Sequence, residues 1–355
     1  MSTTGLTPAP GTGFFRDRPA VRWGIIGCGD VTELKSGPAF NKATHSRLVA
    51  VMRRDAAKAA DYARRHQVPR WCDNVDALLR DPEVDAVYIA TPPDAHLDCA
   101  LQVAAAGKPA YLEKPMARNT TECDVIVSAF AARQLPLFVA YYRRRLPRFL
   151  LVRDALARGT IGTVTGITYC QTAPFHRRDS AWRTDVTRAG AGHLLDLGSH
   201  TVDLIDFLFG PLEHVTGSAA NLASPYLAED VAAMAFTAGG IPGTATWNFA
   251  SDVAGESLRI YGTAGRIDFA VFEPGPVVIE TSAGVQRLDC PHPENVQLPL
   301  IQSVVDDLRG VAPCPSTGTS ARRASAVLDR VLNAYYGGRD DAFWTRPATW
   351  PGRRG

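Results

Sequence analysis

The first half of the chain alternates between short apolar runs and amphipathic stretches. Apolar runs that predict strands lie at residues 21–27, 47–52, 85–91, 109–112 and 135–142. Stretches that predict helices lie at residues 55–66, 94–108 and 119–134. Because strands that alternate with helices indicate βαβ units, we predict an α/β domain with a doubly wound parallel sheet over residues 21–142.

The second half shows a different pattern. Helices are predicted at residues 147–158, 192–209, 295–309 and 319–336. Strand-like runs lie at residues 163–173, 213–221, 231–237, 243–250, 256–261, 265–270, 276–281 and 284–289. Consecutive strands joined by Gly- or Pro-containing turns indicate an antiparallel or mixed sheet. We therefore predict an α+β domain over 143–340 with a large, open, mostly antiparallel sheet, a flexible tail at 1–20 and a C-terminal tail at 341–355.

Composition narrows the class of protein. The 355 residues suit two domains, and 46% hydrophobic with 21% charged residues is typical of a globular protein. The net charge of +2 predicts no broad attraction to nucleic acid or to an anionic membrane. No apolar stretch approaches the roughly 18 residues of a membrane span, and residues 1–20 lack the apolar core of a signal peptide. We expect neither a nucleic-acid nor a membrane partner.

The cysteines bear on the compartment and on metal binding. There are seven, an odd number, and they are widely spaced without a Cys-x-x-Cys pair. This usage favours reduced thiols in a cytoplasmic protein over disulfides or zinc. His193 and His200 are seven positions apart without an evident third ligand, so we predict no metal site.

A glycine turn follows the first predicted strand. The segment GIIGCGDVT (24–32) places Gly27 and Gly29 between a strand and a helix, with Thr32 where the dinucleotide fingerprint has a third glycine. Glycines let backbone N–H groups approach a diphosphate, and the helix N-terminus adds positive charge. We expect Gly27, Gly29, Asp30 and Val31 to contact a dinucleotide; the alternative is an ordinary tight strand-to-helix turn.

The end of the second strand bears on cofactor choice. An NAD site usually places an acid here, about 20 residues after the turn, to bind the ribose hydroxyls. The segment VMRRD (51–55) carries Arg53 and Arg54 instead. Because a guanidinium can bind a 2′-phosphate that a carboxylate would repel, we predict NADP(H) rather than NAD(H). Asp55 either contacts a ribose or caps the following helix.

Two further strand ends carry candidate residues, since ligands of a doubly wound sheet bind beyond the carboxyl ends of its strands. Thr91, Pro92 and Pro93 follow one strand, and His96 either caps that loop or contacts cofactor. Glu113 and Lys114 follow another, in the segment YLEKPMA (111–117). Lys114 belongs either to a surface turn or to a cleft where its ammonium exchanges a proton.

The helix predicted at 192–209 supplies possible partners. Asp196, His200 and Asp203 are spaced i, i+4 and i+7, which places them on one helix face. An acid one turn before a histidine can orient the imidazole and stabilise its protonated form. Histidine titrates near neutral pH and is suited to proton transfer. Asp203 is equally compatible with a structural hydrogen bond.

Taken in order, several motifs resemble one family. They are GIIGCGDV (24–31), ATPPDAH (90–96), AGKPAYLEKPMA (106–117), FVAYYRRRLP (138–147), WR (182–183), GAGHLLDLGSHTVDLIDFLFG (190–210) and LRIYGTAGRIDF (258–269). The chain resembles the glucose–fructose oxidoreductase/inositol dehydrogenase (Gfo/Idh/MocA) family, and VMRRD looks more like its NADP-dependent, dihydrodiol-dehydrogenase-type members. The family often has Asn at the place of Pro93 and Gly at the place of Ala191.

The resemblance implies a Rossmann domain and an open C-terminal sheet that often forms homodimers or homotetramers. It also implies hydride transfer between nicotinamide and a secondary alcohol or ketone of a sugar, cyclitol or diol. Lys114, Asp196 and His200 match the family's catalytic residues, with Lys114 and His200 able to exchange roles, and Arg143 matches an arginine near nicotinamide and substrate. Residues that either line the substrate pocket or pack in the core are Tyr142, Tyr169, His176, Trp182 and Arg183.

Three functions are compatible with these residues. The favoured one is an NADP-dependent oxidoreductase that acts on CH–OH groups of a small molecule. A redox-neutral glycosidase with tightly bound NAD is the second, although Arg53 would then have no 2′-phosphate to bind. A non-catalytic NADP-binding sensor is the third, and the combination of Lys114, Asp196 and His200 argues against it.

Overall fold

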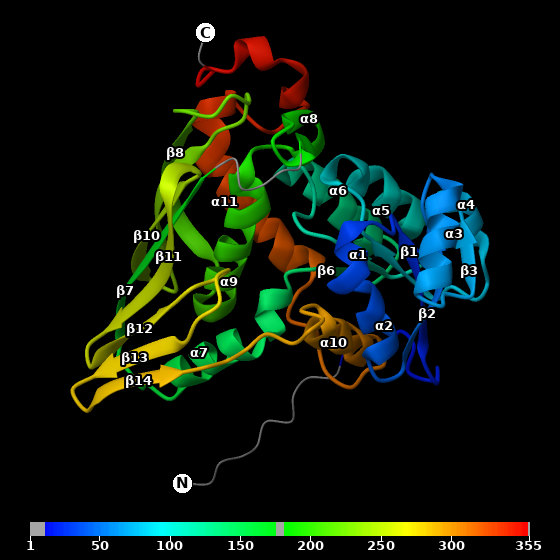
Figure 1. The fold of residues 1–355 in the computed structure, drawn as a ribbon, viewed down its shortest axis with the longest axis horizontal. Coiled ribbons are helices and arrows are strands. Elements are labelled where there is room, and N and C mark those ends of the chain that lie inside the picture. Colours follow the sequence, from blue (N-terminus) through cyan, green and yellow to red (C-terminus); the bar gives the residue numbers. More distant parts are fainter. Residues whose placement is uncertain (1–10, 175–180, 354–355) are drawn as a thin grey trace.

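The fold is seen in a computed structural model of the chain, whose described residues are 11–174 and 181–353. Its first sheet contains, in spatial order, β3 (Arg70–Cys72), β2 (Ser46–Met52), β1 (Val21–Ile26), β4 (Ala86–Ile89), β5 (Ala110–Leu112) and β6 (Leu137–Val139). All neighbouring strands are parallel. This confirms the predicted doubly wound Rossmann sheet (Figure 1).

Helices cover both faces of this sheet, and every residue of β4 and β5 is therefore buried. The helices are α1 (Asp30–Leu34), α2 (Gly37–Lys42), α3 (Ala56–Arg65), α4 (Val75–Arg80), α5 (His96–Ala105) and α6 (Thr120–Ala131), with 3₁₀ turns η1 (Pro93–Ala95) and η2 (Tyr142–Arg145). Strand β3 was not predicted because it lies at the sheet edge: Arg70 and Trp71 are exposed, which leaves no apolar run to detect.

The second sheet has eight strands. In spatial order they are β14 (Gly284–Leu288), β13 (Val277–Thr281), β12 (Gly265–Phe269), β11 (Ala250–Gly262), β7 (Val164–Pro174), β10 (Ile241–Asn248), β9 (Val231–Ala238) and β8 (Leu212–Ala220). Only β7 and β10 pair in parallel; all other neighbours are antiparallel. The predicted large, mostly antiparallel sheet is thereby confirmed.

One face of the second sheet packs against helices and the other face is open. Helices α9 (Ser199–Phe209) and α11 (Gly318–Tyr336) lie between this sheet and the first domain, while α7 (Pro147–Ala157) lies near its β13–β14 end (Figure 1). Side chains of β7 alternate accordingly: Ile167 and Tyr169 are buried, whereas Thr168 and Cys170 are exposed. Helices α9 and α11 form a helical layer that joins the two sheets.

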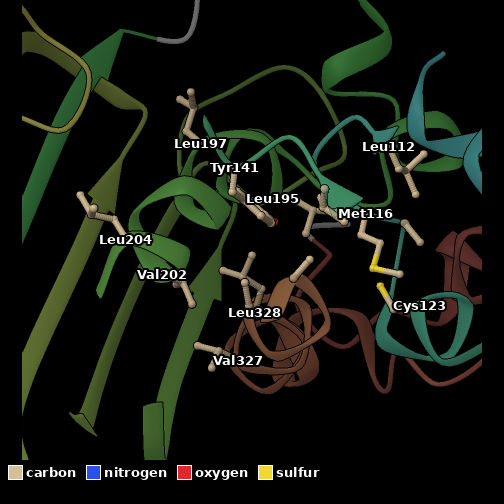
Figure 2. Packing of buried hydrophobic residues seen from close by; sticks show 14 of the residues in the cluster. Leu112, Met116, Cys123, Tyr141, Leu195, Leu197, Val202, Leu204, Val327 and Leu328 are labelled. Atoms are coloured by element: carbon tan, nitrogen blue, oxygen red, sulfur yellow. The ribbon is translucent and has the colours of Figure 1, made fainter. Parts of the chain in front are cut away.

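The two domains share a continuous hydrophobic core. Leu112, Met116 and Cys123 of the first domain face this core, and the second domain contributes buried residues from α9, α11 and the π-helical turn η5 (Leu194–Gly198). Figure 2 shows the labelled members Leu195, Val202, Leu204, Val327 and Leu328. Because buried side chains of both domains belong to one cluster, this core fixes the ends of β5 and β6 relative to α9.

The division between the domains differs from the predicted one. Helix α10 (Leu298–Leu308), predicted as part of the second domain, buries Leu300 and Ile301 in the core of the first. In the predicted N-terminal tail, Thr12 donates hydrogen bonds to the Asp307 carboxylate at the end of α10. In the predicted C-terminal tail, Phe343 is buried. Parts of both tails are thus packed against the domains, because each supplies apolar or hydrogen-bonding groups.

Among the described residues, no helix is both long and apolar enough to cross a bilayer.

A buried ion network attaches η2 to α9. Arg144 donates from Nε and Nη2 to the Asp203 carboxylate at 2.7–3.0 Å and from Nη2 to Asp206 at 2.9 Å. Arg323 of α11 also binds Asp206, at 2.7 Å. Asp203 therefore has the structural role that was one of its two predicted alternatives.

Replacing Arg144 with Met should lower the free energy of unfolding by about 3–5 kcal/mol, because Asp203 would keep its burial and lose its counterion. Urea denaturation followed by tryptophan fluorescence measures the change. Arg153→Met is the matched control: its ion pair with Asp154 is 44% and 51% exposed and should contribute less than about 1 kcal/mol. Equal losses in the two variants would contradict a structural role for the network.

Candidate active site

A cleft of about 1160 Å³ lies beyond the carboxyl ends of β1, β2, β4 and β5. The chain leaves β1 and β4, which are neighbours, toward opposite sides of the sheet, so their ends form the topological switch point where such folds bind ligands. Residues of η2, η5 and α9 form the other wall. The cleft therefore has one wall from each domain.

The glycine turn after β1 fits a diphosphate. Gly27 has φ +89°, and a Cβ there would lie 2.9 Å from Thr91 Cγ2 and 3.1 Å from the carbonyl carbon of Ala90. A Cβ on Gly29 would meet only the Gly27 carbonyl oxygen, at 3.9 Å, so the space beside this turn is open. A larger residue at 29 would fill that space. Glycine at both positions thus leaves room for a dinucleotide's phosphates against the backbone.

Cations gather at the end of β2. Arg53 donates from Nη1 to the carbonyl of Cys28 at 3.1 Å, which places its guanidinium beside the glycine turn. Arg54 and Lys58 also line the cleft. Asp55 caps α3 by accepting from the Lys58 N–H at 3.1 Å, and its carboxylate lies 3.3 Å from Lys58 Nζ. Of its two predicted alternatives, Asp55 therefore has the capping role.

Lys114 joins the two walls of the cleft. It follows β5, its peptide bond to Pro115 is cis, and its ammonium donates to Asp196 Oδ1 at 2.5 Å and to the Asp196 carbonyl at 2.8 Å. Arg183 Nε lies 3.3 Å from the other carboxylate oxygen. Burial alone would raise the pKa of Asp196, but the Lys114 ammonium and Arg183 hold that pKa below its usual range. Asp196 is therefore a carboxylate shared by two cations.

His200 is held in an aromatic setting on α9. Its ring meets those of Tyr141, Tyr142 and Phe272 edge-on, with centroids 5.2–5.8 Å apart. Burial, reinforced by the charges of Arg143, Lys114 and Lys35, lowers the pKa of His200 well below 6.5. The imidazole is thus neutral at pH 7 and able to accept a proton.

The expected contact between Asp196 and His200 is wrong. Asp196 lies in the π-helical turn η5, and its carboxylate is directed to Lys114 and Arg183 rather than to the imidazole. Two cations compete better for a carboxylate than one neutral ring. His200 Nδ1 has no hydrogen-bond partner within the described residues. Asp196 therefore positions Lys114, and aromatic packing orients His200.

Two predicted site residues lie outside the cleft lining. The imidazole of His96 is buried within 2.8–3.2 Å of the carbonyls of Thr91, Pro115 and Met116, so it joins the loops after β4 and β5. The hydroxyl of Tyr169 donates a hydrogen bond to the Glu256 carboxylate at 2.9 Å, and its ring packs against Trp247 in the core beside the second sheet. A strand residue on the buried face cannot reach the cleft. His176 lies outside the described residues.

The remaining predicted residues line the cleft, and several others do so without having been predicted. The predicted ones are Gly27, Gly29, Asp30, Val31, Arg53, Arg54, Thr91, Pro92, Pro93, Glu113, Lys114, Tyr142, Arg143, Trp182, Arg183, Asp196 and His200. The unpredicted ones include Lys35, Lys58, Asp94, Arg188, Phe272 and Gln297. Proximity to the glycine turn could have indicated Lys35, but only tertiary folding brings Phe272 and Gln297 to the cleft.

Glu113 forms part of the cleft wall and has a structural role. Its Oε1 accepts from the Tyr88 hydroxyl at 2.5 Å and from Gln297 Nε2 at 2.6 Å, and its Oε2 accepts from the Lys114 N–H at 3.1 Å. These bonds fix the backbone from which Lys114 projects. Within residues 11–174 and 181–353, no group of three or more His, Cys, Asp or Glu side chains is arranged to hold a metal ion.

Comparison with known proteins identifies the class. Residues 21–141 match the oxidoreductase family with an NAD-binding Rossmann fold, and residues 149–268 match the GFO/IDH/MocA C-terminal domain. Oxidoreductase P35 of Formosa agariphila is 36% identical over 314 residues, 87% of this chain and 97% of that protein. The chain therefore belongs to the Gfo/Idh/MocA family of NAD-binding oxidoreductases.

Two further comparisons place the chain within this class. Trans-1,2-dihydrobenzene-1,2-diol dehydrogenase of Bos taurus is 29% identical over 254 residues, 69% of this chain and 73% of that protein. The structure of levoglucosan dehydrogenase in complex with NADH superposes with a TM-score of 0.81 at 18% identity, covering 88% of this chain and 96% of that one. The second similarity is one of fold.

The lowered pKa of His200 predicts a distinctive titration. The Cε1–H resonance of His200, identified by its loss in His200→Gln, should stay at its neutral position as the pH falls through 6.5, because burial and three nearby cations oppose protonation. In urea-unfolded protein the same histidine should titrate near 6.5.

The sign of the linked stability change follows from the same shift. Below about pH 6.5 the unfolded chain binds a proton at position 200 that the folded chain does not, so folding stability falls as the pH drops. A His200 titration near 6.5 in folded protein would contradict a neutral imidazole held by its surroundings.

Proposed function

We propose that the protein is an NADP(H)-preferring oxidoreductase that transfers hydride between nicotinamide and a secondary alcohol or ketone of a sugar, cyclitol or diol. The observation that carries the proposal is the meeting of Lys114 and a neutral His200 in one cleft whose other end is the open Gly27–Gly29 turn. A dihydrodiol dehydrogenase among the relatives supports an alcohol with neighbouring hydroxyls as substrate.

The reaction separates a carbinol into a hydride and a proton. A bound nicotinamide would supply the acceptor for the hydride of the carbinol carbon. The hydroxyl proton must leave the oxygen as the ketone forms. A ring nitrogen of His200 accepts that proton, because the imidazole is neutral. The Lys114 ammonium, held by Asp196, donates a hydrogen bond to the same oxygen and stabilises its developing negative charge. Ketone reduction reverses each step.

Removing either group should slow turnover far more than it weakens cofactor binding. We expect Lys114→Met and His200→Gln each to lower kcat by about 10²–10⁴-fold, because each removes a group acting on the reacting oxygen. Absorbance at 340 nm over a panel of polyols and ketosugars measures kcat, and NADPH fluorescence measures binding.

The control for these variants is Lys42→Met, which removes an exposed lysine paired with Glu294 outside the cleft and should leave both quantities unchanged. Near-normal kcat in both Lys114→Met and His200→Gln would refute the assigned chemistry.

Three cations support the preference for NADP(H). Arg53, Arg54 and Lys58 line the cleft at the end of β2, where the adenosine ribose of a Rossmann cofactor lies. Asp55 is the carboxylate at this position, and it is already engaged by the start of α3 and by Lys58. A 2′-phosphate would meet positive charge here, and NAD(H) would leave Arg53 and Arg54 without an anionic partner among the described residues. NAD(H) is the alternative cofactor.

The variant Arg53→Gln tests the cofactor preference. We expect it to lower the ratio of kcat/KM with NADPH to kcat/KM with NADH by about 10–100-fold, the range of one or two hydrogen bonds to a charged group. Arg64→Gln, which removes an exposed arginine of the same helix region that pairs with Asp61, is the control. A wild-type preference for NADH, or an unchanged ratio in Arg53→Gln, would overturn the assignment.

The proposal includes a cytoplasmic homodimer or homotetramer. The open face of the second sheet presents small side chains, among them Thr168, Cys170, Ala235 and Thr246, which suit close packing of one sheet on another. All seven cysteines are free, as expected in a reducing compartment.

A further inference from the structure

Positive charge exceeds negative charge at the catalytic end of the cleft. Lys35, Lys114, Arg143 and Arg183 line this end, and Asp196 and Glu113 are the carboxylates that Lys114 contacts. The cleft lining also includes Asp30 beside the glycine turn, Asp55, which pairs with Lys58, and Asp94, which pairs with Arg188. The single charge of Asp196 is shared between Lys114 and Arg183. Both oxygens of Glu113 already accept hydrogen bonds from the cleft wall. Lys35 and Arg143 therefore lack a carboxylate partner among the described residues.

Arg143 is fixed and has an unused donor. The residue is only 6% exposed, its Nε donates to the Val271 carbonyl at 3.0 Å, and its guanidinium lies 4.2 Å from the ring centroid of Phe272. Its Nη1 is buried and has no acceptor in the part of the chain that the structure describes. Because a buried donor without an acceptor costs free energy, this geometry suits an anionic oxygen that accepts from Nη1.

Three cations act together at the reacting centre. Lys35 is exposed at the end of α1 and has no ion pair within the described residues. Its charge, with those of Arg143 and Lys114, lowers the pKa of Tyr142 even though burial of that phenol acts in the opposite direction. The same three charges lower the pKa of His200 after burial, the largest cause. The positive potential is therefore felt where substrate would bind.

The cofactor does not account for this charge. Its phosphates belong at the Gly27–Gly29 turn and its 2′-phosphate beside Arg53, whereas Arg143 directly follows Tyr142, whose ring contacts His200. The nicotinamide ring is neutral when reduced and positive when oxidised. Neither form supplies an anion at this end of the cleft.

We propose that the substrate is a sugar acid or related polyhydroxy acid whose carboxylate binds Arg143 and Lys35 while its carbinol oxygen faces Lys114 and His200. This inference rests on the proposed oxidoreductase function and names its substrate class. A phosphate ester shares the anionic chemistry and would meet the same two cations, so the experiment compares the two anions directly.

The test uses the full chain with NADP⁺ and a panel of hexuronates and aldonates, each paired with its uncharged amide and with the matching hexose phosphate. We expect kcat/KM for at least one acid to exceed that of its amide by about 10–100-fold, as for a hydrogen-bonded charged group. Lys35→Gln and Arg143→Gln should each reduce this acid-to-amide ratio by about tenfold. Lys58→Gln, a lysine-to-glutamine control at the adenosine end, should raise KM for NADP⁺ and leave the ratio as in wild type.

The outcomes separate the two proposals. Turnover with acid-to-amide ratios near one, or ratios unchanged in both Lys35→Gln and Arg143→Gln, overturns the carboxylate site and leaves the oxidoreductase. A preference for the phosphate ester over the acid also overturns it. If no compound of this panel is turned over, calorimetry on the NADPH-bound protein decides the carboxylate proposal: a carboxylate site requires tighter binding of an acid than of its amide, weakened in Lys35→Gln. The oxidoreductase proposal fails only if the polyols and ketosugars are not turned over either.

Discussion

The buried ion pair between Lys114 and Asp196 is the interaction on which the cleft depends. Lys114 comes from the end of β5 in the first domain and Asp196 from η5 in the second, and their side chains are only 13% and 15% exposed. Removing two charges from water is costly, so such a pair is stable only with good geometry and further hydrogen bonds. The Asp196 carbonyl and Arg183 supply these additional contacts. The continuous core that the two domains share (Figure 2) holds the two walls of the cleft in position relative to each other.

The same arrangement sets the protonation states of the site. Sharing Asp196 between Lys114 and Arg183 leaves the catalytic end with excess positive charge, and this charge acts on the buried His200 and Tyr142. In the proposed reaction, the neutral imidazole is the proton acceptor and the neighbouring ammonium is the charge stabiliser. It also makes the pocket attractive to an anion. The proposed substrate selection and the proposed acid–base chemistry thus have a common electrostatic origin.

Arg143 and Arg144 are adjacent in the sequence, and their different positions in the structure could not be predicted from it. Arg143 and Arg144 lie in the same 3₁₀ turn, yet Arg143 lines the cleft and Arg144 binds Asp203 and Asp206 in the helical layer. Likewise, Asp196 and Asp203 share a predicted helix face, but the chain passes through a π-helical turn before α9, and only Asp196 reaches the cleft. A π-helical turn closes its hydrogen bond one residue further along the chain than an α-helical turn, and this changes the direction in which later side chains point. The local sequence does not predict such a turn.

The sequence by itself determined the two sheets, most of their helices, the glycine turn and the residues at the strand ends, because apolar periodicity and turn residues act over short distances. Only the tertiary structure decided that Tyr169 and His96 are structural, that α10 returns to the first domain, and that Lys35, Phe272 and Gln297 reach the cleft. Which charges share a counterion is also a tertiary property. It depends on distances between segments far apart in the chain, and these distances follow from how the helical layer packs between the two sheets.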